Sequence, residues 1–137
     1  MFESREEQKR SIIAMLLRLQ ASDHDKQPSE FAYIHKVAMH LGLSEEDVLS
    51  VESALDQYPV NPPSDEKERM TILYYLLFLM EVDGEVSKQE ELLVEHFGML
   101  LGFRIELTSE LISAVKSYTK RSMPPDELLG RIRKYLN

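Results

Sequence analysis

The chain contains no cysteine and no tryptophan, and it has only five glycines. Without cysteine there is no disulfide, no thiolate zinc site and no cysteine nucleophile. The glycines are too scattered to form a loop that cradles a phosphate, and neither G-x-x-x-x-G-K-[ST] nor G-x-G-x-x-G occurs. The metalloprotease motif H-E-x-x-H and the hydrolase motif G-x-S-x-G are missing as well. We therefore predict that the protein is not an enzyme.

Basic residues and long apolar runs are also scarce. The 16 Lys and Arg residues face 24 Asp and Glu residues, and a net charge of −8 disfavours binding to nucleic acid or to anionic lipid. The longest apolar run, residues 72–80, is far too short to span a membrane. The charged residues at 3–7 are unlike the start of a signal peptide. We therefore expect a soluble cytoplasmic protein that neither binds nucleic acid nor spans a membrane.

What the chain does have is an internal repeat. A shift of 60 residues aligns 4–63 with 64–123 without a gap, and fifteen of the sixty aligned pairs are identical. Average composition would give roughly four identities. The matches fall on apolar positions, on Asp23 and Asp83, and on a pair of glycines. We predict two copies of one helical unit, related by a pseudo-two-fold axis.

Each copy carries signals for the ends of helices. Ser87 and Glu90 form an S-x-x-E capping box, which predicts a helix that begins at Lys88. In the other copy Pro28 stands at the same position, where a missing N–H costs nothing. Gly42 and its counterpart Gly102 suit left-handed caps at the ends of these helices. Ser44 and Thr108 are the predicted N-caps of a third helix in each copy.

These signals predict an all-α protein of about seven helices in one bundle-like domain over residues 1–137. The last helix is expected at 124–137, after a break at Met123-Pro124-Pro125. The helix near 65–81 is apolar on nearly all sides, which is typical of a central helix. The helix near 4–21 carries Arg18 on the matching side, so we expect it at the edge.

The stretch EVDGEVSKQE at residues 81–90 resembles the signature of the tellurite-resistance TerB family. The matching residues, after a helix that ends in LLFLMEV, are Asp83, Gly84, Glu85, Val86, Ser87 and Glu90. The resemblance implies an all-helical bacterial protein built from a duplicated unit, without catalytic residues. It further implies a stress-response or accessory module that binds a protein partner, which can be a second copy in a homodimer. A similar domain occurs in a membrane-anchored DnaJ-type co-chaperone.

The same stretch has two physical interpretations. Carboxylates around a flexible Gly84 could supply the oxygen ligands that Ca²⁺ or Mg²⁺ needs, together with the equivalent stretch 23–30. Alternatively, the stretch is an exposed acidic turn in which Glu90 serves the capping box and any cation binds weakly. The spacing does not fit an EF-hand, so we favour the turn and expect no cofactor. The candidate ligands of the alternative, a cation-binding or sensing protein, are Asp83, Glu85, Glu90, Asp23, Asp25 and Glu30.

Two further features leave alternatives open. His24 stands between Asp23 and Asp25, a set that could bind a transition metal, although a solvated histidine is the commoner case. The stretch ELLGRIRKYLN at 127–137 sets three basic residues beside an apolar side. It can dock on a partner or pack back on its own domain, and we favour the second.

Overall fold

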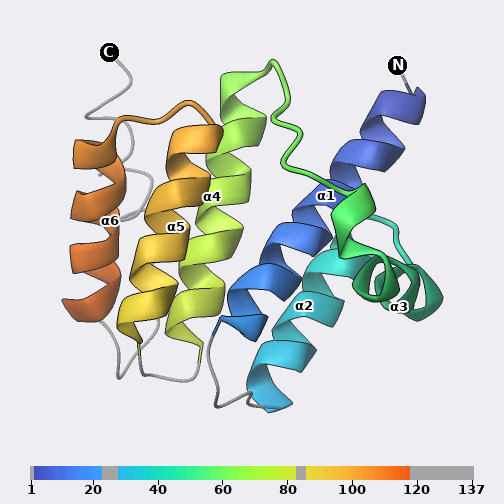
Figure 1. Ribbon diagram of the computed structural model, residues 1–137, viewed down its shortest axis with the longest axis horizontal. Coiled ribbons are helices and arrows are strands. Elements are labelled where there is room, and N and C mark those ends of the chain that lie inside the picture. The colour runs from blue at the N-terminus through green and yellow to red at the C-terminus, as the bar shows by residue number, and fades with distance from the viewer. Residues whose placement is uncertain (1, 23–27, 83–85, 118–137) are drawn as a thin grey trace.

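The computed structural model describes residues 2–22, 28–82 and 86–117. Across these residues the fold is all-helical, with six α-helices, one short 3-10 helix and no strand. The helix predicted over 124–137 lies outside the described residues. No helix in the described part is both long and apolar enough to cross a membrane. The elements, drawn in Figure 1, are α1 (Phe2–Ala21), α2 (Pro28–His40), α3 (Glu45–Ser53), η1 (Leu55–Gln57), α4 (Glu66–Glu81), α5 (Lys88–Leu100) and α6 (Ile105–Ser117).

Local chemistry sets most of the helix ends as predicted. The Ser87 hydroxyl accepts a hydrogen bond from the Glu90 N–H at 3.1 Å, and the Glu90 carboxylate accepts one from the Ser87 N–H at 2.9 Å. Helix α5 accordingly begins at Lys88, and α2 begins at Pro28. Ser44 caps α3 through an equivalent capping box with Asp47.

Glycines end α2 and α5 in the same way. Gly42 and Gly102 have φ angles of 81° and 92°, in the left-handed region that favours glycine. The next residue then donates back to the last turn of the helix. The Leu43 N–H reaches the Ala38 carbonyl at 2.8 Å, and its counterpart after α5 makes the same bond at 2.9 Å. The predicted left-handed caps are confirmed.

The prediction that Thr108 caps the third helix of the second copy is wrong. Helix α6 begins at Ile105, so Thr108 lies inside its first turn and is fully buried. It packs against Gly98 of α5, where an added Cβ would lie 2.5 Å from the Thr108 Oγ1 atom. The threonine serves a close contact between helices rather than a helix end.

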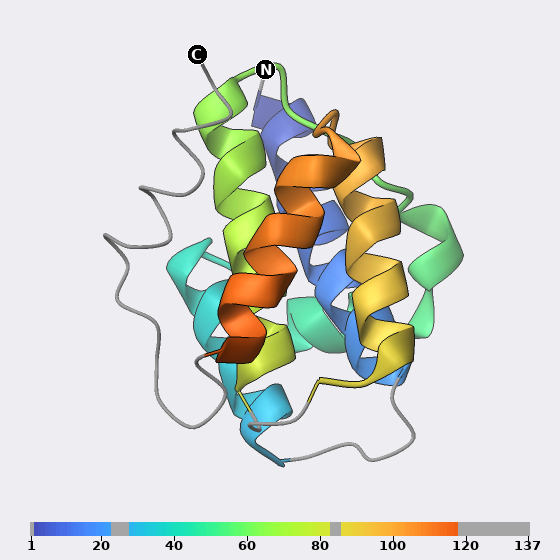
Figure 2. The same cartoon turned by 90° about the vertical axis from the view of Figure 1, so that its left-hand side faces the viewer.

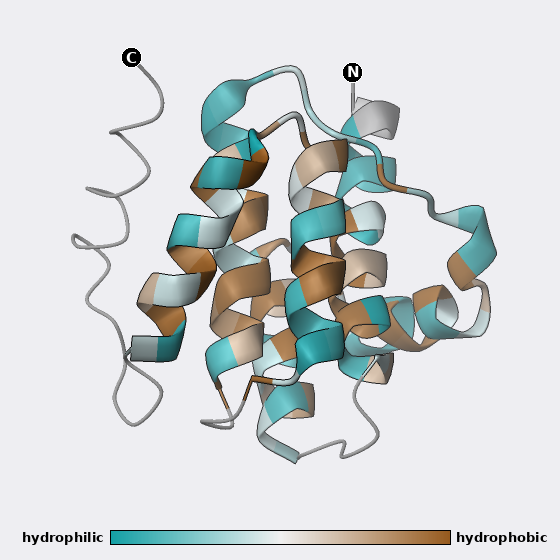
Figure 3. Cartoon of the chain, turned by 60° about the vertical axis from the view of Figure 1, so that its left-hand side comes forward, coloured by the Kyte–Doolittle hydropathy of each residue, from teal (hydrophilic) through white to brown (hydrophobic). Residues whose placement is uncertain are grey.

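Helices α1 and α4 occupy the middle of the molecule. Figure 1 shows α5 and α6 on one side of this pair and α2 and α3 on the other. Figure 2 views the molecule from the α6 side. Bands of apolar and polar residues alternate along the outer helices in Figure 3, as in amphipathic helices that bury one face.

The two halves of the chain correspond in where their helices begin and end and in which helices contact each other. α1 and α4 end sixty residues apart, and the starts of α2 and α5, and of α3 and α6, have the same separation. In the main contacts, α1 packs against α2, α3, α4 and α5. Helix α4 also packs against α2, α5 and α6. The remaining contacts are those of α2 with α3 and of α5 with α6. Exchanging α1 with α4, α2 with α5 and α3 with α6 leaves this set unchanged. Below, residues sixty apart are called equivalent.

The prediction that the first helix lies at the edge is wrong. Leu16 and Leu76, which are equivalent, are both 0% exposed, and both helices contact four others. Arg18 does not force α1 outward, because its guanidinium donates to the backbone carbonyls of Leu55 and Tyr58 at 2.6 and 3.0 Å. Its charged end is thus satisfied within the fold by two backbone carbonyls.

Candidate functional site

The two candidate cation ligands that the structure describes, Glu30 and Glu90, lie at one end of the molecule. Helices α1 and α4 end there, and α2 and α5 begin there (Figure 1). Four of the six candidates, Asp23, Asp25, Asp83 and Glu85, lie outside the described residues. The other two, Glu30 and Glu90, are described and stand at equivalent positions in the first turns of α2 and α5.

Both described carboxylates are buried, Glu30 at 0% and Glu90 at 1% exposed. The exposed acidic turn predicted for 81–90 is therefore wrong at Glu90. Each carboxylate lies in the first turn, where the positive end of the helix dipole favours a negative charge. Glu90 also accepts the Ser87 N–H, which offsets part of the cost of removing the charge from water.

The other described residues of the 81–90 stretch differ from one another in exposure. Glu81, at the end of α4, is partly buried, and burial raises the pKa of its carboxyl. Val82 is exposed, whereas Val86 and Ser87 are partly buried. Of the candidate ligands in this stretch, the structure describes Glu90, which is buried, whereas Asp83 and Glu85 lie outside the described residues.

The described residues hold no group of three or more His, Asp or Glu side chains arranged to bind a metal. His35 is partly buried in α2, and His40 and His96 are exposed. The His96 ring lies 6.2 Å from the Phe97 ring, centroid to centroid. His24, the histidine proposed to join a metal set, lies outside the described residues.

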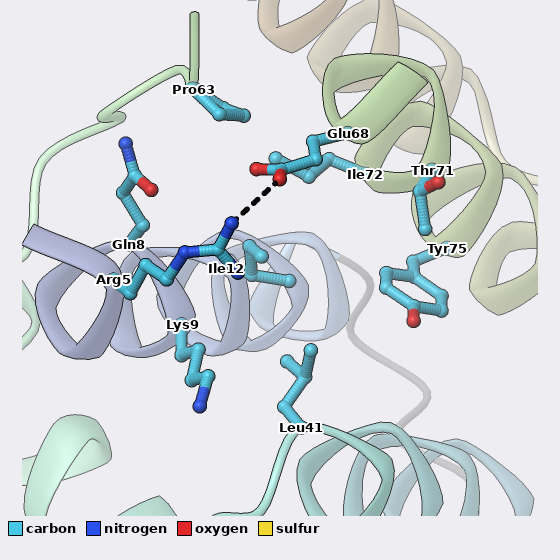
Figure 4. Close-up of a pocket in the computed structure, with 10 residues that line it drawn as sticks. All are labelled: Arg5, Gln8, Lys9, Ile12, Leu41, Pro63, Glu68, Thr71, Ile72 and Tyr75. Atoms are coloured by element: carbon cyan, nitrogen blue, oxygen red, sulfur yellow. Dashed lines mark hydrogen bonds and ion pairs between the residues drawn. The ribbon is translucent and has the colours of Figure 1, made fainter. Parts of the chain in front are cut away.

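A pocket that the sequence did not predict lies between α1 and α4. Its volume is about 240 Å³, and Figure 4 shows the side chains that line it. Equivalent residues face each other across it, because Ile12 and Ile72 both line its wall. Arg5 and Glu68 close one side with an ion pair of 3.4 Å, both side chains being about half exposed. An exposed pair of this kind contributes little to stability.

A second unpredicted feature is an aromatic groove between α2 and α4, with a volume of about 390 Å³. The Tyr33 hydroxyl donates to the Tyr75 backbone carbonyl at 2.9 Å and ties the two helices together. Burial is the main reason that the pKa of Tyr33 is raised above its usual value. The rings of Tyr74 and Phe78 lie 4.4 Å apart, centroid to centroid. The residues that line the groove are Tyr33, Lys36, Val37, His40, Tyr74, Tyr75 and Phe78.

The aromatic residues of α4 were the available signal for this groove. Because these residues make the helix near 65–81 apolar on nearly all sides, the whole helix was expected to be buried. The structure places the leucines of α4 in the core and leaves Tyr74, Tyr75 and Phe78 only partly buried. Residues on different sides of one apolar helix cannot be sorted by periodicity alone.

Exposed apolar side chains gather on the outside of α5 and the start of α6. Leu92 and Met99, two turns apart on α5, are each 54% exposed. Leu100 and Ile105, on either side of the turn into α6, are 46% and 47% exposed. We call these four residues the α5–α6 patch. Single exposed apolar residues are common, but a group of four on neighbouring turns is typical of an interaction surface.

Comparison of the chain with protein-family models, with curated proteins and with solved structures finds no match. The resemblance to the TerB family thus depends on the motif at residues 83–90 and on the internal repeat.

Proposed function

We propose that this protein is a non-catalytic, TerB-like helical module that acts in a stress response, or as an accessory protein, by binding a protein partner. The α5–α6 patch carries the proposal, because it sets four large apolar side chains, each about half exposed, on α5 and the start of α6. An apolar patch with a polar rim favours another protein over nucleic acid, which requires a basic surface.

The proposal includes a duplicated architecture. The two halves of the chain are copies of one helical unit related by a pseudo-two-fold axis that passes between α1 and α4. Support comes from the fifteen identical pairs, from helix ends sixty residues apart, and from helix contacts that survive exchange of the halves. The halves differ on their surfaces, since Leu92 of the patch is equivalent to Ala32 and Ile105 to Glu45. A partner can therefore distinguish one half from the other.

The experiment compares partner capture by the native chain and by a Leu92→Glu, Met99→Glu variant, each tagged and crosslinked in cells that express it. Leu49→Glu is the matched control, because Leu49 is 56% exposed but lies on α3, away from the patch. The native chain and the control should enrich the same protein, and the double variant should lose it. Thermal unfolding checks that all three chains are folded. We expect that they are, because surface substitutions usually change stability by less than about 0.5 kcal/mol. A double variant that keeps the partner would refute the role of the patch.

A second candidate function is cation binding or sensing, and the burial of Glu30 and Glu90 favours it. Buried carboxylates in proteins are commonly paired or bound to metals. Here each stands directly after an acidic stretch, 23–25 or 83–85. In this alternative Asp83, Glu85 and Glu90 bind Ca²⁺ or Mg²⁺, and Asp23, Asp25 and Glu30 form the equivalent site.

A further inference from the structure

The pocket between α1 and α4 has an apolar inner wall. Ile12 of α1 and Ile72 of α4 are 9% and 2% exposed, and Pro63, which also lines the pocket, is buried. Leu41 and Tyr75 complete the apolar lining and are partly buried. A ligand in this pocket would therefore bury an apolar body against side chains that are already fixed by the core.

The charged side chains that line the same pocket are mostly basic. Arg5 and Lys9 stand one turn apart on α1, and Glu68 stands on α4. They set two positive charges against one negative charge, in a chain whose net charge is −8. In Figure 4 the Arg5 guanidinium points towards Glu68, and Lys9 extends away from it. A local excess of positive charge on an acidic protein attracts an anion.

Both basic groups are held only loosely by their acidic partners. The Arg5 Nη2 atom lies 3.4 Å from the Glu68 Oε1 atom, and the Lys9 Nζ atom lies 3.4 Å from the Glu6 Oε1 atom. A well-formed hydrogen bond between charged groups is about 2.7–2.9 Å long. Glu6 is also shared with Arg10, whose guanidinium reaches it at 3.0 Å. A ligand carboxylate can therefore bind Arg5 and Lys9 without breaking a strong ion pair.

The volume of the pocket limits the size of its ligand. The pocket measures about 240 Å³. Sites for drug-sized molecules and cofactors measure about 300–1,000 Å³. An apolar cavity of about 150 Å³ holds one benzene ring. The pocket thus suits a ring or branched chain with a short extension, and it is too small for a nucleotide.

We propose that this pocket binds a small organic monocarboxylate with an apolar body, such as an arylalkanoate. The carboxylate binds the Arg5 guanidinium, whose paired N–H donors match its two oxygens, and Lys9 adds a second positive charge one turn away. The apolar body lies against Ile12 and Ile72. Glu68 competes with the ligand for Arg5. The inference goes beyond the partner-binding role and does not depend on it, since the α5–α6 patch lies on other helices.

Binding is tested on the full-length chain with phenylbutyrate as the probe and the methyl NMR signals of isoleucine as the readout. A phenyl ring in the pocket should shift the signals of Ile12 and Ile72 in a saturable way, with a Kd on the order of 1 mM or lower. Ile105, which is 47% exposed on α6, is the control, and its signal should not move. Unshifted Ile12 and Ile72 signals at about 10 mM probe would overturn the proposal. So would an equal shift of Ile105, which would indicate non-specific binding.

Two analogues of the same shape test whether the pocket selects a carboxylate. Phenylbutyramide is neutral and phenylbutylamine is cationic, and both keep the phenyl ring and the chain. Phenylbutyrate should bind at least about tenfold more tightly than either analogue. Tenfold corresponds to ~1.4 kcal/mol, close to the least that a hydrogen bond to a charged group contributes. If either analogue bound as tightly as phenylbutyrate, the assigned ligand class would be contradicted.

Variants of the charged residues test which groups bind the probe. Arg5→Gln and Lys9→Gln should each weaken phenylbutyrate binding by about threefold or more, whereas Glu68→Gln should strengthen it because it releases Arg5. Lys67→Gln is the matched control, since it removes a positive charge from an exposed residue of α4 that does not line the pocket. It should leave the Kd unchanged. If the ion pair served only the fold, Arg5→Gln and Glu68→Gln would change the Kd in the same direction, and that result would overturn the proposal.

Discussion

Gly98 and Thr108 set the distance between α5 and α6. The glycine is buried in the last turn of α5, where glycine costs up to about 1 kcal/mol relative to alanine. Its benefit is the close approach of Thr108, whose Oγ1 atom would lie 2.5 Å from a Cβ at position 98. The equivalent positions in the other half are Ala38 and Val48, both buried.

We predict that Gly98→Ala destabilises the protein by about 1–2 kcal/mol, because the overpacking penalty exceeds the gain in helix propensity. Adding Thr108→Ala should recover most of the loss, since the nearest remaining contact, at the Thr108 Cβ, is 3.4 Å away. Urea unfolding of the two single variants and the double variant gives the coupling energy. A stabilising Gly98→Ala would show that the helices are not packed this closely.

Acid should weaken the N-terminal cap of α3, because protonation of Asp47 removes the charge of its capping carboxylate. The Ser44 backbone N–H donates to its carboxylate at 2.8 Å, and this bond is the main reason that the pKa of Asp47 is lowered. The Ser44 hydroxyl and the Arg10 guanidinium lower it further. Because the folded-state pKa lies below the unfolded value near 3.9, the carboxylate stabilises the fold above about pH 4. The contribution is lost as the pH falls through the folded-state pKa.

The expected result is that Asp47→Asn lowers Tm at pH 7, and that the difference from the native chain shrinks at pH 3. Glu46→Gln is the matched control, because Glu46 lies in the same first turn and is exposed. It should have a smaller effect at both pH values. A difference between Asp47→Asn and native that is the same at pH 7 and pH 3 would contradict this assignment.

The role of a residue could be predicted from the sequence when its partners are close in the chain. The prediction was wrong when the role depends on a contact with a distant residue. The Ser87 and Glu90 capping box, and the left-handed Gly102, follow from residues within five positions of each other. Thr108 was assigned to a cap because threonine often caps helices, but its actual neighbour is Gly98 on another helix. The sequence alone could not pair these two residues.

At the scale of elements, α1 and α4 form a central pair with similar burial. The sequence favoured α4 as the only central helix because it counted Arg18 as a surface residue. The carbonyls of Leu55 and Tyr58 that accept its guanidinium lie about forty residues away in the chain, so the sequence alone could not pair them with Arg18. Element type and most boundaries were thus predictable from local patterns, with the start of α6 as an exception, whereas the depth of a helix depended on a segment that folds over it.

Leu16→Ala and Leu76→Ala should each destabilise the protein by about 2–5 kcal/mol, the usual range for a buried leucine. Both side chains are 0% exposed and belong to the same core. Chemical denaturation measures both values, and Leu92→Ala is the control because Leu92 is half exposed. If Leu16→Ala alone lowered the free energy of unfolding by less than about 1 kcal/mol, the central position of α1 would be contradicted.

At the scale of the whole molecule, the surface features can be compared between positions sixty residues apart in the sequence. The pocket between α1 and α4 is lined by residues of both helices, among them Ile12 and Ile72, which are sixty residues apart. The α5–α6 patch and the aromatic groove lie where the halves differ in sequence. The internal repeat in the sequence predicted that the two halves would correspond. Which of their differing residues lie on the surface was known only from the structure.

Function at this scale depends on whether the acidic stretch 81–90 binds a cation tightly. The partner-binding proposal requires no cation, whereas the alternative requires one at Asp83, Glu85 and Glu90. A ligand present at 100 times its dissociation constant stabilises a protein by about 2.7 kcal/mol, so thermal unfolding is a sensitive readout.

The decisive measurement is the Tm of the native chain and of Asp83→Asn, with a chelator and with millimolar Ca²⁺, Mg²⁺ or Zn²⁺. Lys67→Gln, an exposed change on α4, controls for general effects of charge. We predict that Tm changes by no more than about 1 °C with any cation, and equally in all three chains, because less than about 0.3 kcal/mol is then gained. A rise of several degrees with one cation, present in the native chain and the control and abolished by Asp83→Asn, would contradict the account and make this a cation-binding protein.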